Sequence, residues 1–287
     1  MNAKAPISAV LITLNAERHL ERVLASVAFC QQILILDSGS TDRTLEIARA
    51  FGATVHSQAF LGFGPQKQKA VDLAGNDWVL VVDADEVLDA QARRAIEALD
   101  LGDHTRSWRI RRRSFVADRE VRYGVWSPDR SLRLFHRGHA RFNDLPVHES
   151  VVATGTVLEL PGSIAHYSFS DLADVFARMG SYSRAKAALY RAKGRRAGPL
   201  TLMARMGWGF LRSYVVKRGF LDGNAGVVVA LSLAVDSVVA MALASEPAPA
   251  PTASEESSVI TRPSEVARAS TVDAHRKAMA ASFKKPT

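Results

Sequence analysis

Three acidic side chains follow directly on an apolar stretch of the chain. Trp78 to Val82 is an unbroken apolar run, typical of a short strand buried on both faces, and Asp83, Asp85 and Glu86 come next. Ionised carboxylates crowded at such a point repel one another unless a cation neutralises them. At the carboxyl end of a strand in an open α/β sheet, Asp-x-Asp favours Mg²⁺ or Mn²⁺ shared with a phosphate. The alternative is an acidic helix N-terminus, where the helix dipole stabilises negative charge.

Another acidic residue, Asp37, ends the predicted strand 33–36, and the loop after it is small and polar. Such a loop lets a ligand approach backbone N–H groups at the start of the next helix. Asp37 would then accept a hydrogen bond from a nucleotide base or ribose, and a plain turn with a capped helix is the alternative. No G-x-G-x-x-G follows the first strand, which disfavours a Rossmann dinucleotide site.

Strand and helix alternate over the N-terminal third of the chain. The predicted strands cover 7–14, 33–36, 53–56 and 78–82, and the predicted helices cover 17–29, 44–51 and a stretch from Pro65 on. Short links between alternating elements predict a right-handed parallel α/β sheet. Farther along, the pattern predicts strands over 106–116 and 131–135 and helices over 171–192 and 200–217.

Four stretches in this order resemble the nucleotide-sugar half of the family 2 inverting glycosyltransferases, which have the GT-A fold. They are 9–15, 37–42, 66–67 and 78–86. The resemblance implies a set of nucleotide-binding residues, with Asp83 near the ribose: Thr13, Asn15, Asp37, Lys67 and Asp83. It also implies that Asp85 binds a divalent metal, Mg²⁺ or Mn²⁺, on the diphosphate of the donor.

The middle of the chain is where we expect the acceptor chemistry. Inverting transfer needs one carboxylate that takes the proton of the acceptor hydroxyl during a single displacement, opposite the departing diphosphate. We predict that Glu149 is this base and that His148 tunes its pocket or binds metal or phosphate. A surface salt bridge between Glu149 and one of the many Arg side chains is the alternative.

The same segment narrows the resemblance to lipopolysaccharide core glucosyltransferases of the WaaE/KdtX type, over about residues 6–244. The stretches that carry it include 126–129, 132–135 and 146–149. In that group, Val-His-Glu stands where relatives carry a Glu-Asp base. The Gln-x-x-Arg-Trp motif of processive synthases is absent, which favours the addition of one sugar.

Basic residues are concentrated in two stretches of a chain whose formal net charge is +8, namely 106–141 and 178–218. Excess positive charge implies an anionic partner. The predicted helix 200–217 interleaves basic with aromatic residues, which is typical of a surface that binds anionic lipid. A solvated basic face over an ordinary core is the alternative. Nucleic acid is not expected as a partner, because no RNA- or DNA-binding motif is present.

Residues 225–244 are apolar over a length that could span a bilayer, but Asp236 near the centre favours a helix that is buried or lies in the membrane surface. From Ser245 on, Pro, Ser and Ala dominate, which predicts a disordered tail.

The single cysteine, Cys30, fits a reducing compartment, and no signal peptide precedes the first strand. We therefore expect a cytoplasmic protein, peripheral on the cytoplasmic face of the inner membrane.

These observations predict an α/β fold of the GT-A type, Rossmann-like with a mostly parallel sheet. The expected parts are a nucleotide-sugar half (1–105), an acceptor-binding and catalytic half (106–170), a helical, basic, membrane-associating region (171–244) and a tail (245–287). The expected reaction is metal-dependent, inverting transfer of one hexose from a nucleotide sugar, UDP-glucose, to a lipid-linked saccharide such as the lipopolysaccharide inner core. The alternatives are a nucleotidyltransferase acting on sugar phosphates and a non-catalytic, membrane-bound sugar-nucleotide-binding protein.

Overall fold

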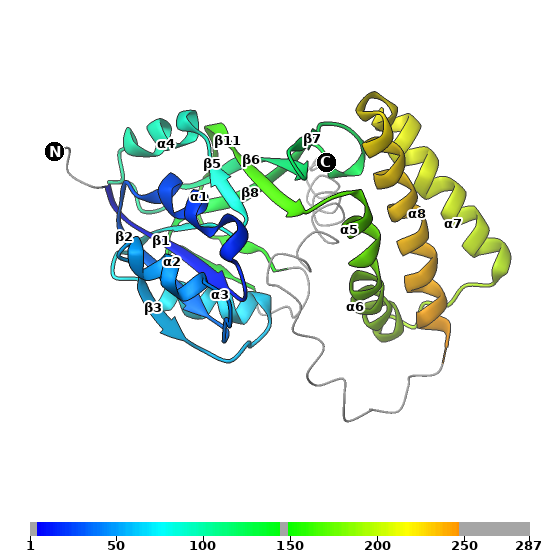
Figure 1. The fold of residues 1–287 in the computed structure, drawn as a ribbon, viewed down its shortest axis with the longest axis horizontal. Coiled ribbons are helices and arrows are strands. Elements are labelled where there is room, and N and C mark those ends of the chain that lie inside the picture. The colour runs from blue at the N-terminus through cyan, green and yellow to red at the C-terminus, as the bar shows by residue number, and fades with distance from the viewer. Residues whose placement is uncertain (1–4, 144–148, 247–287) are drawn as a thin grey trace, which may run out of the picture. The chain divides into compact units, whose positions relative to one another are not determined.

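The computed structural model describes residues 5–143 and 149–246 and divides them into two compact units (Figure 1). The first, here called the sheet unit, contains the described residues up to Glu120 and those from Pro128 to Ser168. The second, the helical unit, contains Val121–Ser127 and the described residues from Phe169 on. The expected tail lies outside the described residues from position 247 onward, so its disorder stays a prediction.

Half of the main sheet is parallel. Its strands are neighbours in the order β3 (Thr54–Ser57), β2 (Cys30–Asp37), β1 (Ala5–Thr13) and β4 (Trp78–Val81). Helices α1 (Glu17–Val27), α2 (Thr44–Ala50) and α3 (Phe63–Asp72) connect them, as the alternating pattern predicted. In the register of β1 with β2, Thr13 lies opposite Asp37, so the two polar strand ends meet at one edge of the sheet.

The sheet continues with strands from the middle of the chain. After β4 come β8 (Asp129–His136), β6 (Ser107–Val116), β11 (Val157–Phe169) and β5 (Glu86–Leu88), with β7 (Arg119–Val121) paired to β6. The β4–β8, β8–β6 and β11–β5 pairs are antiparallel. A separate ribbon pairs β9 (Ala140–Phe142) with β10 (Val151–Ala153). The central strands β4 and β8 therefore join the two halves that the sequence distinguished.

The main core of the sheet unit joins α1 and α4 (Ala90–Glu97) to side chains of the sheet. Leu20 and Leu24 of α1 pack there with Leu80 of β4 and Ile96 of α4, and all four are almost completely buried. Burying one such side chain stabilises the fold by about 1.5–3 kcal/mol. The helical spacing of apolar residues in α1 thus fixes this helix on the strands that carry the polar ends.

The acidic stretch after β4 lies in a strand-to-strand connection. Asp83 and Asp85 lie between β4 and β5, and Glu86 is the first residue of β5. Helix α4 begins only after Asp89, whose side chain accepts a hydrogen bond from the N–H of Ala92 and caps the helix. The alternative of an acidic helix N-terminus for the first three acids is therefore wrong.

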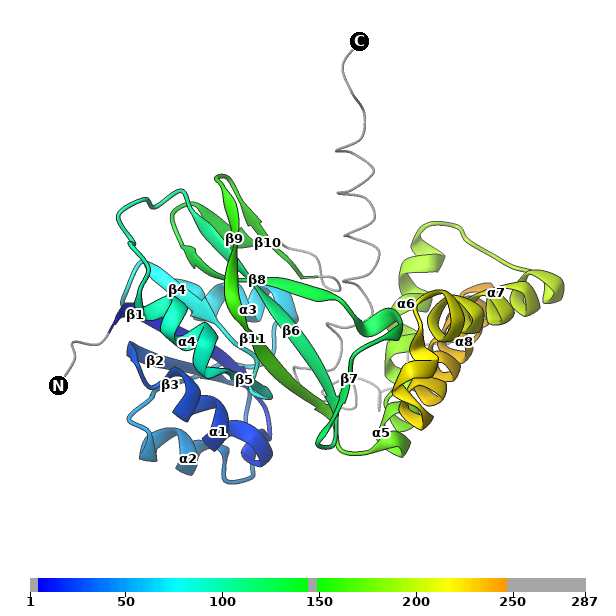
Figure 2. The same ribbon diagram turned by 90° about the horizontal axis from the view of Figure 1, so that it is seen from above.

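The helical unit is built around one apolar helix, α8 (Asn224–Ser245), which packs on α6 (Met179–Ala192) and α7 (Pro199–Leu211), as Figure 2 shows. The predicted helix 171–192 is split into α5 (Leu172–Ala177) and α6, and α7 ends in a π-helical turn, Arg212–Val216. Among the described residues, α8 alone is long and apolar enough to cross a membrane, but a buried core helix passes the same test. Asp236 of α8 is itself buried inside this unit.

Candidate active site

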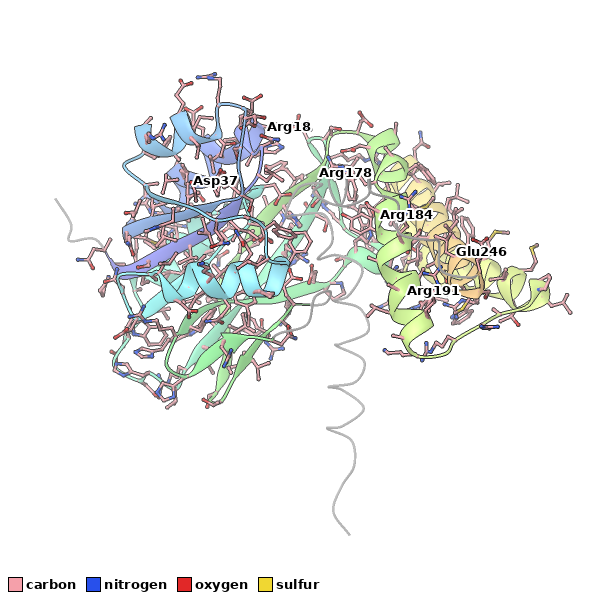
Figure 3. The ribbon with its side chains drawn as sticks, turned by 90° about the horizontal axis from the view of Figure 1, so that it is seen from below. Arg18, Asp37, Arg178, Arg184, Arg191 and Glu246 are labelled. Carbon is pink, nitrogen blue, oxygen red and sulfur yellow. The ribbon has the colours of Figure 1, made fainter. Side chains whose placement is uncertain are left out.

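Asp37 organises the loop that follows β2. Its Oδ1 accepts a hydrogen bond from Oγ1 of Thr13 at 2.7 Å, and its Oδ2 accepts from the backbone N–H groups of Gly39 (2.9 Å) and Ser40 (2.8 Å). Both Asp37 and Thr13 are buried. Gly39 has a φ of 99°, a left-handed conformation that glycine adopts without strain. The carboxylate thus holds a tight, N–H-rich loop at the edge of the sheet (Figure 3).

Asn15 ties the end of β1 to the same loop. Its side-chain oxygen accepts from the N–H of Thr41 at 2.8 Å, and its own N–H donates to Oγ of Ser40 at 2.9 Å. Its φ of 49° is left-handed, which Asn tolerates better than most residues. The structure therefore brings together Thr13, Asn15 and Asp37, three residues predicted to line a nucleoside pocket, while their contact with a nucleotide stays a prediction.

A buried group of opposite charges lies at the end of β4. Nζ of Lys67, on α3, lies 2.7 Å from Oδ1 of Asp83 and 3.2 Å from Oε1 of Glu149, which precedes β10. Arg133 of β8 approaches the other oxygen, Oδ2, of Asp83 at 3.1 Å. The four side chains are only 3–5% exposed. Three residues predicted to act on the donor and acceptor therefore share one ion-paired cluster.

Two arginines complete the neutralisation of the acidic stretch. Arg133 also pairs with Glu86, and Arg112 of β6 lies 3.4 Å from the same carboxylate while donating from Nε to Asp129 at 2.7 Å. The sequence predicted that a cation must neutralise these acids, and for Asp83 and Glu86 protein side chains do so. The sequence analysis did not single out Arg112, although the alternation along β6 places it on the same inward face as Trp108 and Ile110.

Lys67 and Asp83 stabilise each other's charged forms. Burial by itself would lower the pKa of the Lys67 ammonium, but Asp83 and Glu149 outweigh it and raise that pKa above its usual value. Burial would likewise raise the pKa of Asp83, yet Lys67 and Arg133 hold it well below the usual range. The Asp83 carboxylate therefore acts as a hydrogen-bond acceptor and as a fixed negative charge.

Helix α3 connects the Asp37 loop with the buried charge cluster. Gln66, completely buried beside Lys67 in sequence, donates from Nε2 to Oγ of Ser38 at 3.1 Å. Lys67 reaches the charge cluster from the same helix turn. The dipeptide Gln66-Lys67 therefore links the Asp37 loop to Asp83 at the end of β4.

Asp85 lies against a histidine that the sequence analysis did not single out. In the β11–β5 register His166 lies opposite Glu86, and its Nε2 is 3.2 Å from Oδ1 of Asp85. Both side chains are largely buried. The sequence did not assign this position to His166, because the pairing of β11 with β5 is a long-range contact.

A carboxylate oxygen and an imidazole nitrogen in this position suit a divalent metal. No group of three or more His, Cys, Asp or Glu side chains converges within 5–143 and 149–246. That fits a Mg²⁺ or Mn²⁺ ion shared with a diphosphate, which takes one or two protein ligands and keeps several waters. The donor set therefore fits a metal at Asp85 with His166 beside it, and does not fit an all-protein cage.

Glu149 is not the exposed salt bridge that was its alternative interpretation. Its side chain is 3% exposed, and among the described residues its Oε2 has no hydrogen-bond partner. A buried carboxylate with one oxygen held by Lys67 and the other unsatisfied can accept a proton from a hydroxyl group. His148 lies outside the described residues, so its predicted role stays untested.

Comparison with known proteins identifies similar glycosyltransferases. The model of the family "Glycosyl transferase family 2" matches residues 8–150, a stretch that begins in β1 and ends just after Glu149. The chain is 31% identical over 248 residues to the lipopolysaccharide core biosynthesis glycosyltransferase LpsC of Rhizobium meliloti, covering 82% of this chain and 90% of that protein. It is 28% identical to an uncharacterized glycosyltransferase of Rickettsia bellii, covering 77% and 80% of the two chains.

One similar solved structure is the glucosyl-3-phosphoglycerate synthase of Mycobacterium tuberculosis with Mn²⁺ and UDP-glucose. It is 28% identical over 38% of this chain and 43% of that one, with a TM-score of 0.30, too low to say anything about ligands here. The family match, the relative that covers most of the chain and the sheet described above agree with one another. The chain belongs to glycosyl transferase family 2 and has the GT-A fold.

Proposed function

We propose that this family 2 glycosyltransferase transfers one hexose, glucose from UDP-glucose, with inversion to a lipid-linked saccharide such as the lipopolysaccharide inner core. The observation that carries the proposal is the buried cluster of Lys67, Asp83 and Glu149 beside the Asp85–His166 pair. The similarity to a lipopolysaccharide core glycosyltransferase supports the class of acceptor. Glucose and UDP come from the sequence resemblance.

The donor would bind along the edge formed by β1, β2 and β4. Thr13, Asn15 and Asp37 would line the nucleoside pocket, because they hold the loop after β2 at that edge. Asp83 would lie near the ribose, and Lys67 would face the nucleotide. A preorganised loop of this kind reduces the entropy that binding has to overcome.

Asp85 and His166 would hold the divalent metal. Such a metal, when bound, stabilises the negative charge that develops on the departing diphosphate. Asp85 immediately precedes β5 and His166 lies on β11 opposite Glu86, so the β5–β11 register fixes their separation. This register is what the chain itself contributes to the metal site.

Glu149 would act as the base. The acceptor hydroxyl oxygen forms a bond to the anomeric carbon, the bond to the diphosphate breaks, and the hydroxyl proton passes to Oε2 of Glu149. Lys67 positions the carboxylate through Oε1. General-base catalysis of this kind contributes roughly 10²–10⁴-fold to a rate.

Attachment to the membrane surface is supported by α7, which has no buried residue. Its exposed apolar side chains include Leu200 (87% exposed) and Met203 (62%). Arg212, Lys217 and Arg218 follow α7 in the sequence, and exposed apolar side chains combined with nearby basic residues favour binding to the interface of anionic bilayers. We therefore propose a cytoplasmic enzyme, peripheral on the membrane face where lipid-linked saccharides are extended.

The test measures UDP release from a panel of nucleotide sugars with Mn²⁺ or Mg²⁺, with and without extracted glycolipid. Glu149→Gln should lose turnover while calorimetry shows unchanged donor binding, and the control Glu159→Gln removes an exposed carboxylate of β11 and should keep turnover. Loss of donor binding in Glu149→Gln would show that Glu149 is not the base. Release of pyrophosphate would establish nucleotidyl transfer, and donor binding without any turnover would establish a non-catalytic binding protein.

A further inference from the structure

The helical unit encloses a cavity of about 390 Å³ that plays no part in the site described above. It lies among α6, α7 and α8, and every residue that lines it belongs to the helical unit. Its polar wall is formed by Lys186, Arg195, Arg205, Arg212 and Asp236. A cavity this size can hold a small molecule or one end of a larger one.

The charge in this cavity is unbalanced. Asp236 is the one acid in its wall, and it is already engaged by Lys186 and by Oγ of Ser183 at 2.7 Å. Within the described part of the chain, none of the three arginines in the wall pairs with a carboxylate. Three guanidinium groups, two of them half-buried, therefore give this partly enclosed space an excess of positive charge that favours an anion.

Arg205 is fixed in place for such an anion. Its guanidinium carbon lies 5.8 Å from the ring centroid of Tyr190, and its terminal nitrogen is 3.4 Å from the Tyr190 hydroxyl. Its Nε is buried without a hydrogen-bond partner among the described residues. Arginine presents two parallel N–H donors to a phosphate, so a group held by stacking on Tyr190 is preorganised for that ligand.

Apolar side chains also line the cavity, with Val125, Val175, Met179 and Leu233 among them. On α7, Arg205 and Trp208 face the cavity, and Arg212 follows one turn later on the same side. Leu200, Met203 and Leu211 lie exposed on the opposite side of that helix. One helix thus presents a cationic face to the cavity and an apolar face to its surroundings.

We propose that this cavity binds the phosphate group of a lipid, with the arginines on the phosphate and the apolar wall against the attached chain or ring. Inorganic phosphate would leave the apolar wall unused, and an uncharged lipid would leave the guanidinium groups unpaired. The proposal does not depend on the transfer reaction. It is tested without nucleotide, so its failure and the failure of the proposed function are separate results.

The probe is dihexanoyl phosphatidic acid below its micelle concentration, with binding followed by tryptophan fluorescence. Trp126 and Trp208 line the cavity, whereas Trp78 and Trp108 are buried in the sheet unit. Dihexanoyl phosphatidylcholine tests the need for a phosphate with free oxygens, and inorganic pyrophosphate tests the need for the lipid. We expect the phosphatidic acid to bind at least about tenfold more tightly than either.

The variant is Arg205→Gln with Arg212→Gln, and the matched control is Arg184→Gln with Arg196→Gln. The control removes the same charge from exposed positions of the helical unit that do not line the cavity, with Arg184 on α6 labelled in Figure 3. We expect the first pair to weaken binding about tenfold or more and the control to leave it unchanged. Replacing both arginines by Lys keeps the charge and should give an intermediate affinity, which excludes misfolding as the cause. Equal affinity of the two Gln pairs, or pyrophosphate binding as tight as phosphatidic acid, overturns the proposal.

Discussion

Replacing Lys67 by Met tests whether the buried charge cluster is a coupled unit. Met keeps most of the aliphatic stem and removes the ammonium group. Asp83 then retains Arg133 at 3.1 Å, whereas Glu149 loses the one ion-pair partner that the described residues give it. The cost should therefore come mainly from a glutamate that stays buried and unpaired.

The size of the effect follows from burial. The side chains of Lys67, Asp83 and Glu149 are 3–4% exposed, so solvent screens their interactions very little. Removing one partner of a buried ion pair costs about 3–5 kcal/mol, and because Asp83 keeps a partner we expect the lower end, about 3 kcal/mol. Lys69→Met on the same helix is the control, since Nζ of Lys69 contacts the exposed side chain of Gln58.

Urea denaturation followed by circular dichroism gives the free energy of unfolding for each variant. The double variant Lys67→Met with Glu149→Gln removes the unpaired charge, so it should be more stable than Lys67→Met alone. The coupling energy in this double-mutant cycle should be about 1–3 kcal/mol. A loss in Lys67→Met no larger than in Lys69→Met, or additive effects in the cycle, would refute the view that these charges depend on one another.

Three further predictions concern the metal, the loop after β2 and the charge cluster, and a fourth concerns the helical unit. Asp85→Ala should abolish turnover and Mn²⁺-dependent UDP binding together in calorimetry, and normal activity would reject the metal assignment. Asp37→Ala should weaken UDP binding by about 1–3 kcal/mol and speed hydrogen exchange of the loop amides, because two backbone N–H groups lose their acceptor. The pKa of Asp83 is depressed, so its stabilising effect is complete above about pH 4 and is lost as the pH falls below that value. Urea titrations at decreasing pH should therefore show a steeper loss of the free energy of unfolding for the natural chain than for Asp83→Asn. Gly226→Ala would place a Cβ 1.8 Å from the carbonyl oxygen of Gly219. The free energy of unfolding should therefore fall by about 1–3 kcal/mol or more, and the melting temperature should fall with it. An unchanged melting temperature would mean that α8 does not pack this closely.

Much of the sheet unit was predictable because its signals are local. The apolar runs of β1 and β4 and the helical spacing of α1 determine where those elements begin and end, within a few residues. Gly39 and Asp37 likewise encode their turn in a few adjacent positions. Local periodicity and turn chemistry act between neighbours in the chain, so one sequence is enough to identify them.

The family, the strand ends that carry polar groups and the need to neutralise the acids after β4 could all be identified from the amino-acid sequence. Which groups neutralise those acids depends on the folded chain, because Lys67 and Glu149 are separated by 82 positions and Arg133 and Asp83 by 50. The same holds for His166 beside Asp85, which depends on the pairing of β11 with β5. Contacts of this kind arise from packing and strand register, which no short stretch of residues specifies, so the partner of a buried charge appears only when the chain is folded.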